Sequence, residues 1–107
     1  MQLNEYMAKH RKEARAGLLD LFPRIVCKDG FSISIQAGFH AYCSPRSNEG
    51  NWFELEAGMP SEKPSEQLMQ YAENSSRPTH TVYSYVPISV LQAELDSHGG
   101  ISGDAHE

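Results

Sequence analysis

The stretch that decides the fold is residues 23–37, PRIVCKDGFSISIQA, in which two β-rich runs flank Asp29-Gly30. An Asp-Gly pair between runs of β-branched and aromatic residues is the strongest short signal for a β-hairpin. A two-residue type I′ turn, with positive φ at both positions, would place Val26 opposite Ile33. This register predicts a core face made of Val26, Phe31, Ile33, Ile35 and Ala37, with Ile25 and Cys27 on the other face.

Downstream of the hairpin the sequence predicts two more strands and two helices. Residues 52–59, WFELEAGM, alternate between two faces, and residues 81–86, TVYSYV, form another β-rich run. Ser65 is placed to cap a short helix. Pro87 suits the first turn of a final helix, which Gly99-Gly100 would end.

A basic helix is expected before the hairpin, with Asn4 as its cap and Pro23 ending it. Charged residues interrupt its apolar stripe between Met7 and Ala14, so burial in its own domain would hold it poorly. An isolated helix of this length is marginal in water. We therefore expect a second subunit or another partner to contact Tyr6, Met7, His10 and Arg11.

Together these elements predict an α+β fold. A mostly antiparallel sheet of about four strands would have an amino-terminal helix, a short middle helix and a carboxy-terminal helix. The expected organisation is a basic helix (1–22), a single α+β domain (23–100) and a flexible tail (101–107).

Charge is divided unevenly along the 107 residues, whose formal net charge is −5. Residues 1–28 hold six of the nine Lys and Arg but three of the fourteen Asp and Glu, which leaves residues 29–107 strongly acidic. Nucleic-acid binders present a dominant basic face, so direct nucleic-acid binding is not expected. The acidic body instead suits a basic partner, or the basic helix of a second copy in a homodimer.

The sequence also predicts where the protein resides. No apolar run approaches the ~20 residues of a membrane span, and the first residues lack the apolar region of a secretory signal. We expect a cytoplasmic protein with no membrane association, in which Cys27 and Cys43 stay reduced.

Catalytic patterns are weak in this chain. Glu54 and Glu56 share a strand face, as paired carboxylates for acid–base work would, but such alternation is also typical of a solvent-facing strand. The sequence contains no phosphate-binding glycine loop and no serine in a nucleophile elbow. We therefore predict a protein that is not an enzyme and needs no cofactor.

Four residues are of the types that zinc prefers: Cys27, His40, Cys43 and His80. Positions three apart on an extended strand point to opposite faces, so His40 and Cys43 converge only if the chain turns between them. We expect no metal. If the four did converge, the alternative function would be a small metal-binding or nucleic-acid-associated accessory domain.

Aromatic side chains are the most informative candidates for partner binding. Tyr83 and Tyr85 share one face of the predicted strand 81–86, and they face outward near Trp52 if the valines enter the core. The alternative is that the tyrosine face is the covered one. Exposed Tyr and Trp are typical anchors of protein interfaces. The candidate partner-binding residues are Tyr6, Arg11, Trp52, Glu54, Glu56, Tyr83 and Tyr85.

Residues 23–46, PRIVCKDGFSISIQAGFHAYCSPR, with YVP (85–87) and SHGG (97–100), resemble a set of small proteins from bacteriophage and prophage genomes. These strings are not catalytic motifs, so the resemblance carries over no functional residue. It implies an accessory phage product in the cytoplasm of a bacterial host, where small acidic phage proteins include inhibitors of host defence such as anti-CRISPR proteins. The expected function is therefore surface occlusion of a host protein or protein–nucleic-acid complex.

Overall fold

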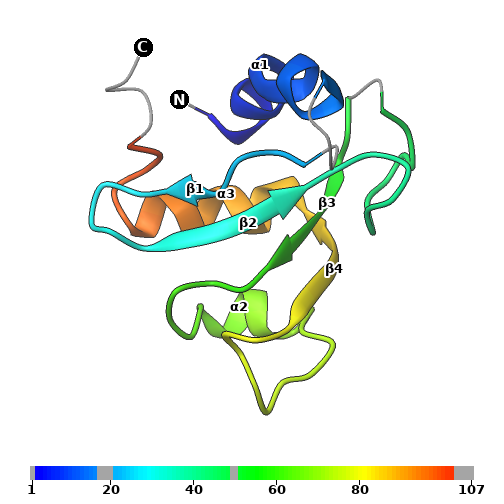
Figure 1. Ribbon diagram of the computed structural model, residues 1–107. Helices are drawn as coiled ribbons and strands as arrows, with labels where there is room; N and C mark the ends of the chain where they lie inside the picture. The colour runs from blue at the N-terminus through cyan, green and yellow to red at the C-terminus, as the bar shows by residue number, and fades with distance from the viewer. Residues whose placement is uncertain (1, 17–20, 49–50, 103–107) are drawn as a thin grey trace.

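Four antiparallel strands form the centre of the computed structural model, which describes residues 2–16, 21–48 and 51–102. Their sequence order is also their spatial order: β1 (Ile25–Val26), β2 (Ser32–Gln36), β3 (Glu54–Gly58) and β4 (Val82–Pro87). The helices are α1 (Leu3–Ala16), α2 (Glu66–Met69) and α3 (Ile88–Ser97). Figure 1 shows α3 behind the β1–β2 hairpin, with α1 and α2 at opposite ends of the molecule. This is the predicted α+β arrangement.

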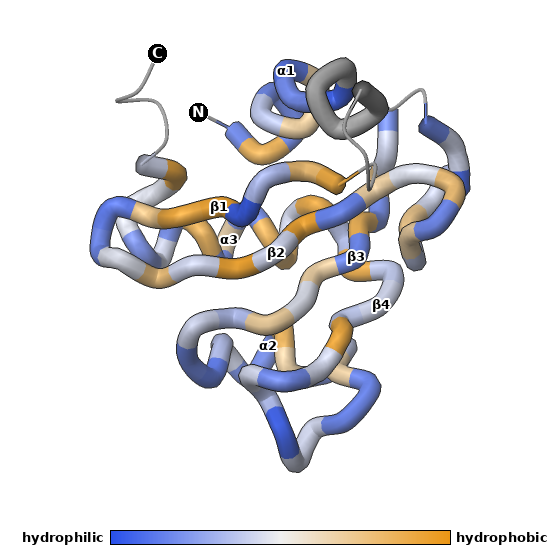
Figure 2. The backbone as a smooth tube through the Cα atoms, in the orientation of Figure 1, coloured by the Kyte–Doolittle hydropathy of each residue, from blue (hydrophilic) through white to orange (hydrophobic). Residues whose placement is uncertain are grey.

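Hydrophobic segments gather along β1, β2 and α3, whereas the loop between α2 and β4 is hydrophilic (Figure 2). The buried side chains form one core that joins the sheet to α1 and α3. Within the described ranges, no helix combines the length and the apolar character that a membrane span requires.

The hairpin forms as predicted, but its turn is one residue longer than expected. The Cys27 amide donates to the Phe31 carbonyl at 2.7 Å, and the Gly30 amide donates to the Cys27 carbonyl at 2.9 Å. Gly30 has a φ of 96°, while Asp29 stays at negative φ and its carboxylate accepts from the Phe31 amide at 2.9 Å. The prediction of a two-residue type I′ turn was wrong, because the Asp29 carboxylate stabilises a three-residue loop instead.

The longer turn moves the register of β1 by one residue. Ile25 pairs with Ile33, so Ile25 and Cys27 enter the core and Val26 is 46% exposed. The predicted core face of β1 was therefore wrong, since a shift of one residue turns every side chain of a strand to the opposite face. The predicted core face of β2 is confirmed.

A bulge near the middle of β4 changes which of its side chains are buried. Leu55 pairs with Val86 and Ala57 with Tyr83, so three steps along β4 match two steps along β3. Tyr83 and Val86 are both buried, and Tyr85 is 42% exposed. The prediction that the two tyrosines share one face was wrong, because the extra residue changes the alternation of the strand.

The Ser65 and Gly99-Gly100 signals at the two later helices are confirmed, whereas Pro87 lies at the N-cap of the final helix and not in its first turn. The Ser65 side chain accepts from the Leu68 amide and caps α2. The final helix begins directly after Pro87 and ends before Gly99 and Gly100, whose φ values are 88° and 84°. Positive φ suits glycine because it has no Cβ, which is why these two residues end the helix.

The first two turns of α1 pack against the chain's own core. Leu3, Tyr6 and Met7 are buried. The Leu3 amide donates to the Gln92 side chain of α3 at 2.6 Å, and the Tyr6 hydroxyl donates to the Pro23 carbonyl at 3.3 Å. The helix starts one residue before the predicted Asn4 cap, and residues 21–24 are not helical. Its beginning therefore needs no second subunit to hold it.

Other parts of the chain hydrogen-bond to both edges of the sheet. Ile101 is buried and pairs with Cys27, and the Ser102 amide donates to the Val26 carbonyl. At the other edge, Ala72 pairs with Tyr83 of β4. The predicted flexible tail was thus wrong for residues 101–102, which belong to the fold, while residues 103–107 lie outside the described residues.

The burial of Leu3 predicts that Leu3→Ala lowers the free energy of unfolding by about 2–5 kcal/mol, as expected for a large-to-small change in a core. Urea unfolding followed by circular dichroism measures it. Ala8→Ser, at an exposed position of the same helix, should cost no more than about 0.5 kcal/mol. Equal stability of the two variants would show that α1 is not part of the cooperative core.

The hairpin geometry predicts that Gly30→Ala destabilises the protein by about 1–2 kcal/mol, because a Cβ is disfavoured at φ 96° even though the space around it is open. Gly58→Ala is the matched control. Its φ is not positive, and the added Cβ would meet the Thr81 carbonyl at an ordinary 3.7 Å. Thermal unfolding of both variants decides the matter, and an unchanged Gly30→Ala would contradict the described turn.

Candidate functional site

A patch of aromatic and charged side chains lies on the outward face of β3 and β4. We call it the tyrosine patch, and it consists of Tyr42, Arg46, Glu54, Glu56 and Tyr85. The rings of Tyr42 and Tyr85 are 6.0 Å apart, and the Arg46 guanidinium lies 6.0 Å from the centre of the Tyr42 ring. Both tyrosines are about two-fifths exposed, at 41% and 42%. The patch therefore presents aromatic surface beside both signs of charge.

The loop of residues 37–48 places Tyr42 and Arg46 on this face. Ser44 pairs with Glu54 at the start of β3. The Tyr42 amide donates to the Glu56 carboxylate at 2.9 Å, and the Tyr42 carbonyl accepts from the Tyr85 amide at 3.1 Å. These contacts tie the loop to β3 and β4, so the tyrosine patch has a defined backbone beneath it.

Tyr85 reaches the patch through a strained backbone. Its φ is 52°, a left-handed conformation that costs a residue with a side chain roughly 1–2 kcal/mol. Such strain persists only where the surrounding structure enforces it, and it is concentrated at functional sites. Bulges commonly redirect a side chain next to a site. The exposure of Tyr85 is thus a specific feature of the fold and not a default of the strand.

The predicted partner-binding residues fall into three groups. Glu56 and Tyr85 both contact Tyr42 of the tyrosine patch, and Glu54 lies two residues before Glu56 on β3. Tyr83 and Trp52 are buried, so the expectation that they face solvent was wrong. The remaining two, Tyr6 and Arg11, lie on α1.

Trp52 is 7% exposed because it precedes β3, where the alternation of the strand does not yet apply. Its ring meets Phe22 edge-on at 6.0 Å, and its indole N–H donates to the Ser47 carbonyl at 2.7 Å. Tyr6 is likewise covered, with its ring 4.3 Å from that of His10. Sequence reasoning missed Tyr42 and Arg46, since their position depends on how the loop folds back over the sheet.

The four residues considered for metal do not converge. Among the described residues, no group of three or more His, Cys, Asp or Glu side chains could hold a metal ion. The Cys27 thiol donates to the Leu95 carbonyl inside the core, and Cys43 contacts Gly38 within its own loop. Burial, together with the charges of Asp29, Glu94 and Asp96, raises the pKa of Cys27 to about 11. A thiol in that state is a poor ligand and a poor nucleophile.

A comparison with protein-family models finds no match, and comparisons with curated proteins and with solved structures find none either. What the chain does must therefore be argued from its own geometry.

Asp29, Glu94 and His98 form a cluster of titratable groups at one end of α3. His98 Nδ1 lies 2.6 Å from the Asp29 carboxylate, and Nε2 lies 3.5 Å from the Glu94 carboxylate. The imidazole also stacks on the Phe31 ring, with centroids 3.9 Å apart. Glu94 is 5% exposed and accepts a 2.6 Å hydrogen bond from the Ser65 hydroxyl. The cluster joins the hairpin turn to α3 and to the cap of α2.

This cluster is built for a charged histidine. Burial alone would lower the pKa of His98, but the hydrogen bond to Asp29 and the charges of Asp29 and Glu94 outweigh it and raise that pKa. The pKa of Asp29 is lowered, first by the hydrogen bond from the Phe31 amide and then by that from His98. Each ring nitrogen of His98 faces a carboxylate, so the imidazole is engaged as an ion-pair donor and not as a general base.

These shifts predict a window of pH in which the cluster stabilises the fold. The stabilisation by His98 is complete below about pH 6.5, its ordinary pKa, and is lost as the pH rises through the higher folded value. The stabilisation by Asp29 is present above its ordinary pKa of 3.8 and is lost as the pH falls through the lower folded value. Stability should therefore be greatest between these limits.

Denaturant unfolding at about pH 6 and about pH 9 tests this window. In His98→Gln, the loss of stability between the two pH values should be smaller than in the wild type. His80→Gln is the control, since His80 is exposed and its ring contacts the Thr79 hydroxyl. If all three proteins lose the same stability over this range, the cluster does not contribute to the fold.

Proposed function

We propose that this protein acts by binding a macromolecular partner through the tyrosine patch and catalyses no reaction. The observation that carries the proposal is the exposed pair Tyr42 and Tyr85 beside Arg46. Tyr and Arg are among the residues most enriched where binding energy concentrates in protein interfaces. The strained backbone of Tyr85 supports the proposal, because it keeps an aromatic ring at the surface at an energetic cost.

Charge indicates the kind of partner. Glu54 and Glu56 are half-buried at the patch, within the part of the chain that carries eleven of the fourteen acids. A basic protein surface would complement these carboxylates, and the attraction would speed association and weaken with salt. A nucleic acid, which is itself polyanionic, fits this face poorly.

The resemblance to small phage proteins supports a biological setting for this binding. In that setting the partner is a host protein or protein–nucleic-acid complex in the bacterial cytoplasm. The chain would occlude a basic surface of this partner and inhibit host defence, as anti-CRISPR proteins do. The alternative is a small metal-binding or nucleic-acid-associated accessory domain. We favour it less, because within the described ranges no three His, Cys, Asp or Glu side chains are grouped so as to hold a metal ion.

Affinity capture from a bacterial host lysate, followed by mass spectrometry, tests the proposal. Tyr42→Ala and Tyr85→Asn should each weaken binding of the captured partner by about 30-fold, the loss expected for a residue central to an interface. Asn is chosen because it tolerates the left-handed conformation of Tyr85. Val26→Thr, on the exposed side of β1, is the control and should bind like the wild type.

Two results would contradict the proposal. One is a partner that binds both tyrosine variants as tightly as the wild type. The other is that every protein captured by the wild type is also captured by the tyrosine variants.

A further inference from the structure

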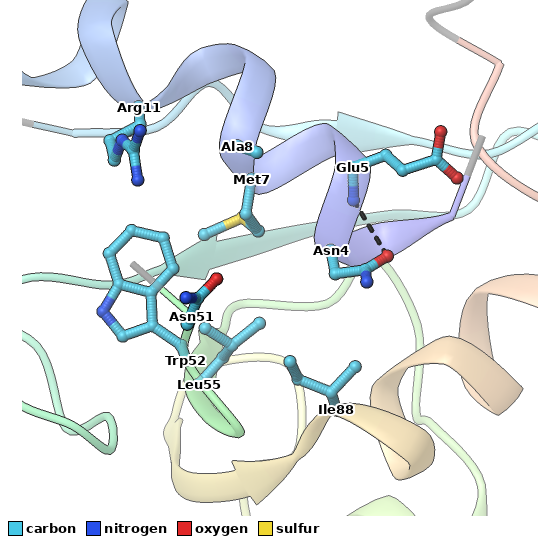
Figure 3. A pocket seen from close by; sticks show the side chains of 9 residues that line it. All are labelled: Asn4, Glu5, Met7, Ala8, Arg11, Asn51, Trp52, Leu55 and Ile88. Atoms are coloured by element: carbon cyan, nitrogen blue, oxygen red, sulfur yellow. Dashed lines mark hydrogen bonds between the residues drawn. The ribbon is translucent and has the colours of Figure 1, made fainter. Parts of the chain in front are cut away.

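A pocket of about 480 Å³ lies between α1, the residues that lead into β3 and the start of α3. Figure 3 shows its floor, where Met7 of α1 faces Trp52 and Leu55. These three side chains are 2%, 7% and 0% exposed, so they offer a ligand almost no surface. The region beside the tyrosine patch is more open and presents polar groups to a partner.

A smaller hollow of about 120 Å³ adjoins the tyrosine patch. The two share Glu56, and Ala41 in the wall of the hollow directly precedes Tyr42 of the patch. The rim is accessible, since Leu21 is 56% exposed and His40 is exposed as well. One water takes up about 30 Å³ in the liquid, whereas small-molecule sites measure roughly 300–1,000 Å³. The hollow therefore suits the end of a single side chain and not a metabolite.

Glu56 is the group of the hollow that can receive a charge. Its side chain is half-buried, and one of its oxygens accepts from the Tyr42 amide at 2.9 Å. A carboxylate has about four acceptor positions, so this contact leaves others open. Within the ranges that the structure describes, no basic side chain forms an ion pair with Glu56. The Gln36 amide, by contrast, is already engaged with Phe22 and Ser34.

The tyrosine patch indicates which cation fits beside this carboxylate. The Arg46 guanidinium lies 6.0 Å from the Tyr42 ring, and its Nε donates to the Ala41 carbonyl at 3.4 Å. The Tyr85 ring is tilted by 46° from that of Tyr42, and no cation of the described residues lies on it. Glu56 lies opposite the bulge that carries Tyr85. An acceptor for positive charge is thus next to an aromatic ring that has no cation.

We propose that the hollow and the tyrosine patch together bind one arginine side chain of the protein partner. The guanidinium would enter the hollow and pair with the Glu56 carboxylate, and the apolar stem would lie against Tyr85. A guanidinium suits this site better than an ammonium, because it is planar, more weakly hydrated and packs on aromatic rings. The inference rests on the proposed function and states which group the basic partner must present.

A peptide titration tests the site directly. The protein, labelled with carbon-13 in its tyrosine rings, is titrated with a glycine–arginine–glycine peptide that is blocked at both ends. The Tyr42 and Tyr85 signals should shift in a saturable manner, with a dissociation constant on the order of millimolar. Tyr83 is buried and should not shift. The same peptide with citrulline, which has the shape of arginine without its charge, should bind about fivefold more weakly.

A matched pair of variants tests the role of the carboxylate. Glu56→Gln should weaken the arginine peptide by a similar factor and leave the citrulline peptide unchanged, since an amide oxygen can still accept from the Tyr42 amide. Glu66→Gln removes the same charge from an exposed position on α2 and should bind like the wild type. The absence of a saturable shift, equal binding of the two peptides, or an unaffected Glu56→Gln would each overturn the proposal.

This proposal and the proposed function can fail separately. If a partner captured through the tyrosines binds Glu56→Gln as tightly as the wild type, the arginine site is overturned and the proposed function stands. If the arginine peptide binds as expected but no partner depends on Tyr42 or Tyr85, the proposed function fails and the arginine site is supported.

Discussion

The partners of one buried carboxylate tie together parts of the fold that lie far apart in the sequence. Glu94 lies on the inner side of α3, where an unpaired charge would be strongly destabilising. Its partners come from different parts of the chain. The Ser65 hydroxyl at the cap of α2 donates to this carboxylate, and His98 at the end of α3 lies 3.5 Å from it. Asp29 in the hairpin turn contacts the other ring nitrogen of His98. Because the same few atoms link the turn, the cap and the helix end, these elements have to take their positions together.

The sequence predicts those parts of the fold that local chemistry decides. Three such signals depend only on contacts within a few residues of the chain, and each lies at the element that it predicts. They are the Asp29-Gly30 turn, the Ser65 cap and the Gly99-Gly100 helix end. The register of β1 could not be predicted in this way, because Asp29-Gly30 fits both a two-residue and a three-residue turn. The hydrogen bond from the Phe31 amide to the Asp29 carboxylate favours the longer turn.

The candidate site could be predicted only in part, for the same reason. Glu54 and Glu56 follow strand alternation and lie where it places them. The positions of Tyr83 and Tyr85 are set by a bulge in the pairing of β4 with β3. The sequence pattern of residues 81–86 does not predict this bulge. Tyr42 joins the patch through backbone contacts with a strand some forty residues later, which is beyond the reach of any periodicity.

The partly covered edges of the sheet constrain how this molecule can meet other proteins. An open edge invites strand addition, in which a foreign segment extends the sheet through backbone hydrogen bonds that are nearly independent of sequence. Here residues 100–102 pair with the end of β1 and residues 71–73 pair with the first half of β4, so part of each edge is engaged within the chain. Along these covered stretches, recognition depends on side chains, which makes it selective. The same cover limits edge-to-edge aggregation when the protein accumulates to high concentration.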